Sequence, residues 1–128
     1  MRVLKFGGTS VGSPASLATV RGIVARYAKE PLVVVVSAHS GVTDQLLALA
    51  RSAAAGGYAL EPLRRRHEEL LRAVDVDPAI LEPLFAELND LLRGLSLVRE
   101  LTPRTLDLVA SYGERMSVRG VSAYFRAG

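Results

Sequence analysis

The sequence contains no cysteine, few aromatic residues and no long apolar run, and each absence excludes a class of protein. Without cysteine the chain forms neither disulfides nor thiolate metal sites, which is typical of a cytoplasmic protein. Its two histidines, His39 and His67, are too few for a structural zinc site, so we expect no metal held by protein side chains. No segment approaches the roughly 18 apolar residues of a membrane span, and the first residues do not resemble a secretory signal. We therefore expect a cytoplasmic location and no membrane partner.

The net charge of +3 and the pI near 9.7 raise the question of nucleic-acid binding. Aromatic residues make up only 5% of the chain, which leaves few side chains for stacking on bases. The basic cluster at residues 64–67 lies beside Glu61, Glu68 and Glu69 in a helical pattern, which is typical of a solvated helix face. We therefore expect no nucleic-acid partner.

The first dozen residues combine a short strand with a glycine turn. Residues 2–6 suit a buried strand, and the paired glycines after them let the backbone approach a ligand closely. Two hydroxyl residues follow the glycines, and a helix is expected to begin at Ser13. A lysine at the end of the strand adds positive charge. Together these features predict an anion site with phosphate as ligand. The lysine precedes the glycines, unlike in the P-loop, and the glycine spacing does not fit the dinucleotide fingerprint, so a plain strand–turn–helix corner is the alternative. The residues of this candidate site are Lys5, Gly7, Gly8, Thr9 and Ser10.

A second strand is expected near residues 32–37, where five apolar residues follow one another without alternation. Such a run is typical of a central parallel strand covered on both faces. The order strand, helix, strand predicts a parallel pair and an α/β fold. The loops after the two strands then lie at one edge of the sheet, where open α/β sheets bind ligands. The second loop leads into a helix over residues 43–55.

The rest of the chain shows helical patterns. Two helices are expected between residues 60 and 99, the second broken near Gly94, and His67 lies in the apolar stripe of the first, where we expect it to be packed. A further helix begins after Thr102, is interrupted at Gly113 and is followed by another helix over residues 118–125. We divide the chain into a βαβα core at 1–58, a helical insertion at 59–101 and a helical segment at 102–128.

Three stretches resemble, in the same order, the signature motifs of the aspartate kinases within the amino-acid kinase superfamily. They are KFGGTSV at residues 5–11, VSAHSGVTD at 36–44 and SYGERMS at 111–117. The resemblance implies the amino-terminal part of a three-layer αβα amino-acid kinase fold. The helical insertion resembles that of the longer aspartate kinases, including the bifunctional aspartokinase/homoserine dehydrogenases.

The resemblance implies ATP-dependent phosphorylation of the side-chain carboxylate of L-aspartate to 4-phospho-L-aspartate, the first step of the lysine, threonine and methionine pathway. Phosphoryl transfer needs positioning and cations rather than covalent participation of the protein. Lys5 suits the catalytic role of balancing phosphate charge; the alternative is an exposed lysine at the end of a sheet. Gly7 and Gly8 would donate backbone N–H groups to the phosphates of ATP, and Thr9 or Ser10 would add hydroxyl bonds. Mg²⁺ would be held mainly by the nucleotide.

The other two motifs would bind aspartate. Ser37, Ala38 and Thr43 match family positions that contact it, and Glu114 would hold its ammonium group. The alternatives are a helix-capping role for Thr43 and a surface ion pair between Glu114 and a neighbouring arginine. His39 lies in a polar loop, where we expect it to be solvated and not catalytic.

The resemblance also implies a second half of the catalytic domain that would complete the nucleotide pocket. We therefore expect the sequence to be part of a longer enzyme, to be inactive alone and to form a homo-oligomer. Two other functions stay open. One is another amino-acid kinase, acting on glutamate, acetylglutamate, carbamate or a nucleotide monophosphate. The other is a non-catalytic helical interaction module, because residues 60–110 carry strong apolar stripes.

Overall fold

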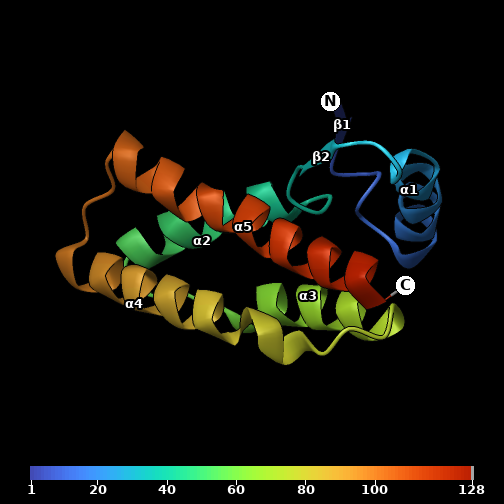
Figure 1. Cartoon of the computed structure of the whole chain (residues 1–128). Helices are drawn as coiled ribbons and strands as arrows, with labels where there is room; N and C mark the ends of the chain where they lie inside the picture. The colour runs from blue at the N-terminus through green and yellow to red at the C-terminus, as the bar shows by residue number, and fades with distance from the viewer. Residues whose placement is uncertain (128) are drawn as a thin grey trace.

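The computed structural model describes residues 1–127 and has two strands and a bundle of helices. Figure 1 shows the strands and the first helix at one end of an elongated bundle formed by the later helices. The α/β class and the parallel pairing predicted from the sequence are confirmed. The elements are β1 (Arg2–Phe6), α1 (Pro14–Tyr27), β2 (Leu32–Val36), α2 (Val42–Ala54), α3 (Glu61–Ala73), the 3-10 helix η1 (Pro78–Leu81), α4 (Glu82–Val98) and α5 (Pro103–Ala127).

Strands β1 and β2 pair in parallel, with Arg2 opposite Leu32 and Phe6 opposite Val36. Helix α1 connects them and begins at the predicted cap. The Ser16 backbone N–H donates to Ser13 Oγ at 3.2 Å, and the Ser16 side chain returns a bond to the Ser13 backbone, which forms a capping box. The cap fixes where the chain turns after the glycine stretch.

One face of the two-stranded sheet is exposed. The side chains of Val3, Val33 and Val35 are 59%, 43% and 42% exposed, and Lys5 shares their face because it is opposite Val35. Helix α5 lies against the other face, beside Val36. The prediction that β2 is covered on both faces is therefore wrong for the described residues 1–127. A run of valines shows that a strand tolerates burial, but it does not show that a second layer is present.

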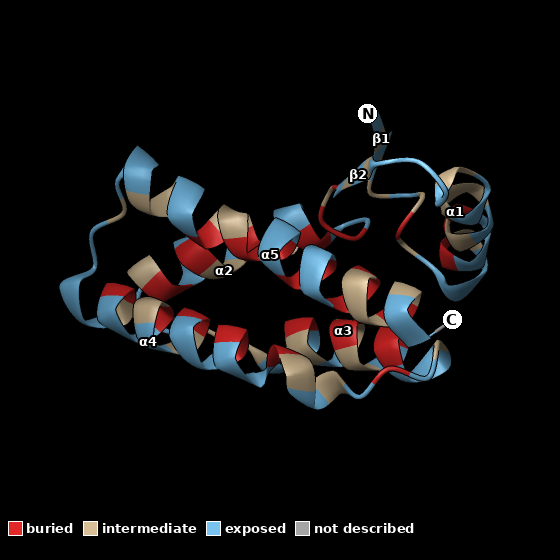
Figure 2. Ribbon diagram, in the orientation of Figure 1, coloured by how far each residue is buried: buried red, intermediate tan, exposed pale blue. Residues whose placement is uncertain are grey.

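The hydrophobic core lies inside the helix bundle. Figure 2 shows that the buried sides of the bundle helices face one another. The core contains residues from all three segments predicted from the sequence. The division of the chain at residues 58 and 101 therefore stays a prediction. The fully buried large side chains include Leu46, Leu63, Leu81, Phe85, Leu88 and Met116.

Helices α4 and α5 are both longer than the sequence predicted. Helix α4 continues through Gly94, and α5 continues through Gly113 to Ala127, so both predicted interruptions are wrong. A glycine inside a helix costs only about 1 kcal/mol relative to alanine. Buried side chains on both sides of each glycine, such as Leu92 and Leu95 in α4, offset that cost by packing. Among residues 1–127 no helix has the length and apolarity of a membrane span.

Candidate functional site

The loops that follow the two strands are bonded to each other. We call residues 7–13 the glycine loop and residues 37–41 the serine loop. The Ser37 N–H donates to the Phe6 carbonyl at 3.0 Å, and the Ser40 N–H donates to the Gly8 carbonyl at 3.1 Å. A Cβ atom at Gly8 would lie 2.9 Å from the Ala38 carbonyl oxygen, so this approach requires glycine. The prediction that both loops lie at one edge of the sheet is confirmed.

The third motif, on α5, touches the serine loop through a second glycine. A Cβ atom at Gly113 would lie 2.9 Å from Ala38 Cβ and 3.1 Å from Leu46 Cδ1. Ala38 is only 6% exposed. Its carbonyl meets Gly8 and its methyl group meets Gly113, so this residue joins the three motifs. The spacing between them therefore depends on two glycines and one small side chain.

This contact gives a stability prediction. Gly113→Ala is expected to lower the free energy of unfolding by about 1 kcal/mol, because an overpacking cost of roughly 1–3 kcal/mol exceeds the gain of about 1 kcal/mol in helix propensity. Gly94→Ala is the matched control on an open helix face, where nothing lies within 4 Å of the added Cβ. This variant is expected to raise the free energy of unfolding by about 1 kcal/mol. Urea denaturation followed by circular dichroism measures both. Stabilisation by both variants would contradict the tight contact at Ala38.

The candidate phosphate residues surround the glycine loop. Lys5 is exposed at the end of β1, Gly7 and Thr9 are exposed, and Gly8 and Ser10 are half-buried. Lys5 lies on the open face of the sheet. Within residues 1–127 no hydrogen bond or ion pair occupies its ammonium group.

The candidate aspartate residues lie on the serine loop, α2 and α5. Ser37 is half-buried, and Thr43 and Glu114 are exposed. The cap of α2 is Gly41, with φ of 83°, and the helix begins at Val42. The helix therefore begins within one residue of the predicted start, whereas the alternative that Thr43 caps it is wrong. Helix α2 has no side-chain cap, which leaves its amino end open to an anionic ligand.

Glu114 lines a shallow hollow on α5 together with Arg115, Arg119 and Arg126. It forms no ion pair among the described residues. Arg115 instead pairs with Glu87 at 3.4 Å. The alternative in which Glu114 pairs with a neighbouring arginine thus has no counterpart in residues 1–127. The structure also records no direct bond between Glu114 and the glycine loop in this range, so the third motif meets the others through Gly113 and Ala38.

Two histidines lie buried beneath the loops. His39 is 2% exposed, and its Nδ1 donates to the Val11 carbonyl at 2.6 Å, so the prediction that it is solvated is wrong. His67 is fully buried, as predicted, and its Nδ1 donates to the Leu63 carbonyl at 2.9 Å. The ring centroids are 5.4 Å apart. Because carbonyl oxygens only accept, each Nδ1 carries a proton, and each Nε2 is an acceptor without a partner among the described residues.

This environment keeps both rings neutral. Burial lowers the pKa of His39 to about 4, with a smaller contribution from the neighbouring His67 and from Arg66. Burial likewise lowers the pKa of His67. Neutral rings are the form that a buried pair can tolerate, because two adjacent positive charges in an apolar interior would repel each other strongly.

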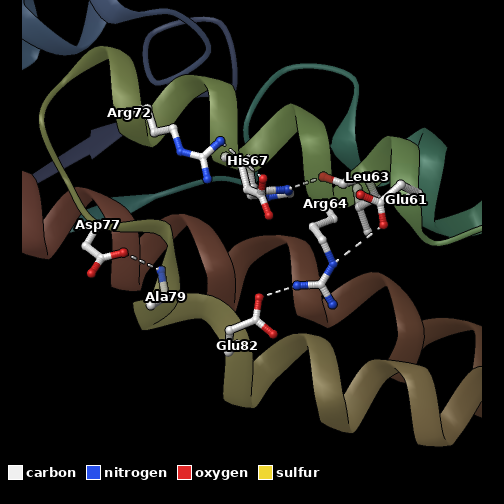
Figure 3. Close-up of polar contacts among 9 residues, drawn as sticks. Glu61, Leu63, Arg64, His67, Arg72, Asp77, Ala79 and Glu82 are labelled. Atoms are coloured by element: carbon white, nitrogen blue, oxygen red, sulfur yellow. Dashed lines mark hydrogen bonds and ion pairs between the residues drawn. The ribbon is translucent and has the colours of Figure 1, made fainter.

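The basic cluster at residues 64–67 is divided among different environments. Figure 3 shows Arg64 between Glu61 and Glu82, and His67 directed toward the Leu63 carbonyl. Arg65 is exposed, whereas Arg66 is half-buried. The prediction of a solvated face therefore holds for part of the cluster only. Sequence reasoning missed the role of Arg66, because its acceptors lie 26 and 54 residues away along the chain.

Residues 1–127 match the family model described as amino acid kinase family. The chain therefore belongs to the amino acid kinase family.

Its relatives within that family include named aspartokinases. The chain is 32% identical to aspartokinase 1, chloroplastic, of Arabidopsis thaliana over 95% of its own length and 23% of the relative. It is 33% identical to the aspartokinase of Chlamydia muridarum over 98% of its length and 27% of the relative. The chain thus spans about a quarter of the length of these curated relatives.

A solved structure shares the fold. The crystal structure of Escherichia coli aspartokinase III in complex with aspartate and ADP matches with a TM-score of 0.78 at 29% identity, over 97% of this chain and 28% of that chain. The lysine and aspartate complex of the same enzyme, described as the T-state, matches with a TM-score of 0.69 at 26% identity. The predicted resemblance to aspartate kinases and the predicted fold are confirmed.

Proposed function

We propose that this chain carries one part of the active site of an aspartate kinase, which transfers the γ-phosphoryl group of ATP to the side-chain carboxylate of L-aspartate. The observation that carries the proposal is the junction at Ala38, where the three motifs meet. The relatives are named aspartokinases, and a structure with the same fold was solved with aspartate and ADP. The product would be 4-phospho-L-aspartate, which begins the lysine, threonine and methionine pathway.

The glycine loop would bind the phosphates of ATP. Its glycines allow close approach, and the backbone N–H groups of Gly7 and Gly8 would donate to phosphate oxygens. Thr9 and Ser10 would add hydroxyl donors. Lys5 would balance charge on the transferring oxygens, since its ammonium group is exposed and unpaired within residues 1–127. Mg²⁺ would arrive with the nucleotide and be held mainly by its phosphates.

The serine loop and the open amino end of α2 would bind the carboxylates of aspartate. Ser37 and Thr43 offer hydroxyl groups, and the helix amino end favours negative charge. Glu114 would accept hydrogen bonds from the ammonium group of the amino acid. Ala38 would hold the loop at its required distance from α5. The attacking carboxylate is already ionised near neutral pH, so the reaction requires no general base.

The relatives are about four times as long as this chain. We therefore propose that turnover needs residues equivalent to the rest of those enzymes and that residues 1–128 alone do not catalyse the reaction. We also propose that the protein is a homo-oligomer, because the exposed valines Val3, Val33 and Val35 offer an apolar surface for association.

The substrate assignment is tested by calorimetric titration of aspartate into the chain and into Glu114→Gln. We expect at least tenfold weaker binding by the variant, because a charge-assisted hydrogen bond contributes roughly 1.5–3 kcal/mol. Glu100→Gln is the matched control, since it removes an exposed carboxylate that lies outside the three motifs and forms no ion pair among residues 1–127. Equal affinity of all three proteins would contradict the role of Glu114. Tighter binding of glutamate than of aspartate would favour another amino-acid kinase.

A further inference from the structure

Helix α3 reaches the point where the glycine loop and the serine loop meet. The Arg66 Nη2 atom donates to the Gly12 carbonyl oxygen at 2.8 Å and makes a longer contact with the Ser40 carbonyl oxygen at 3.5 Å. Gly12 belongs to the glycine loop and Ser40 to the serine loop, so one side chain is bonded to both. An arginine suits this position because its planar group is always charged and presents several donors at fixed angles.

His67, the next residue of α3, contacts the same junction through His39. Its ring lies against that of His39, with the centroids 5.4 Å apart and the planes inclined by 58°. His39 in turn bonds the carbonyl of Val11, the residue before Gly12. Val11 is fully buried. The two neighbouring residues of α3 therefore reach two neighbouring carbonyls of the glycine loop, one directly and one through a ring of the serine loop.

The junction itself is tightly packed. A Cβ atom at Gly12 would lie 2.8 Å from the Gly8 carbonyl oxygen and 3.1 Å from Ser40 Cβ. The guanidinium group of Arg66 therefore binds where the two loops already touch. Removing it would leave two carbonyl oxygens without this donor, and the bonds between the loops would then be the one from the Ser40 N–H to the Gly8 carbonyl and the one from His39 Nδ1 to the Val11 carbonyl.

We propose that α3 is a positioning element of the site, in which Arg66 and His67 fix the serine loop against the glycine loop. The catalytic consequence rests on the proposed function, in which one loop binds the phosphates and the other the acceptor carboxylate. Reacting atoms must lie about 3–3.5 Å apart, and a displacement of about 1 Å can slow transfer a hundredfold. Arg66 touches neither substrate in this scheme and acts through the two loops.

The inference is tested by amide hydrogen exchange, measured by NMR on the chain without ligands. Arg66→Ala is expected to raise the exchange rate of the Ser40 amide at least tenfold, while amides in the middle of α4 keep their rates. Arg66→Lys is expected to retain most of the protection, because an ammonium group also donates to carbonyls. Arg65→Ala is the matched control, since Arg65 is the exposed neighbour on the same helix.

Two results would overturn the positioning role: an unchanged Ser40 rate in Arg66→Ala, or an equal rise in α4, which would show general destabilisation. Aspartate titration then tests the link to function, with about tenfold weaker binding expected for Arg66→Ala and none of this loss for Arg65→Ala. Unchanged aspartate affinity in Arg66→Ala would overturn that link. If the unaltered chain binds no aspartate, the aspartate site proposed on this chain fails, whereas the exchange result still decides whether α3 positions the loops.

Discussion

Replacing Phe85 by alanine is expected to lower the free energy of unfolding by about 3–5 kcal/mol. Phe85 is 1% exposed on α4, and its ring meets that of His67 edge-on with centroids 5.7 Å apart. The Arg64 guanidinium carbon lies over the Phe85 ring, 4.7 Å from its centre. Truncation would remove the transfer free energy of the ring and leave a cavity that a close-packed bundle fills only partly.

Urea denaturation of Phe85→Ala measures this loss, and Leu97→Ala provides the matched control on the same helix. Leu97 is 78% exposed, so its truncation is expected to change the free energy of unfolding by less than about 0.5 kcal/mol. Phe85→Leu retains most of the buried volume, so its loss of unfolding free energy is expected to lie between those of Phe85→Ala and Leu97→Ala. A similar loss for Phe85→Ala and Leu97→Ala would show that α4 is not anchored in the core through this ring.

The sequence was sufficient to predict the elements whose signals are local. The cap at Ser13 and the helix start after Thr102 depend on nearby residues and are confirmed. The parallel pairing of the strands is also confirmed, because the order strand, helix, strand restricts the connection to a crossover. The errors concern features that depend on distant contacts. Gly113 lies inside α5 where an added Cβ would meet Ala38, so this glycine serves a close contact and does not end the helix. Periodicity carries no information about that partner.

The same distinction between local signals and distant contacts applies to the candidate site. The motifs identify Lys5, the glycines and Glu114 as candidate site residues, and their roles stay predictions. The motifs do not show that Ala38 contacts both Gly8 and Gly113. The buried state of His67 could be predicted, because the residue falls in an apolar helical stripe. His39 has polar neighbours in sequence and gives no such signal, although its ring is buried against His67. The basic run at residues 64–66 also does not show which arginine bonds the glycine loop, because only the fold brings Gly12 next to Arg66.

The stability of the chain is expected to fall as the pH is lowered from about 6.5 to about 4, because of the buried histidines. An unfolded histidine binds a proton near its ordinary pKa of 6.5, whereas the folded state holds the pKa of His39 at about 4. Between these values the unfolded state binds more protons, so acid favours unfolding. The full stability is present above pH 6.5, and His39 accounts for a loss of about 3 kcal/mol by pH 4. The lowered pKa of His67 adds a loss of the same sign.

The comparison that isolates this effect is the pH dependence of unfolding in the unaltered chain and in His39→Asn. Asparagine keeps an amide donor for the Val11 carbonyl but does not titrate, so the variant is expected to lose roughly 3 kcal/mol less between pH 7 and pH 4. The acidic residues are common to both proteins, and their contributions cancel in the difference. The charged and titratable groups that act on the His39 ring are His67 and Arg66, both of which oppose its protonation. Parallel curves for the two proteins would show that His39 is not held neutral in the fold, and the buried ring pair beneath the loops would then be refuted.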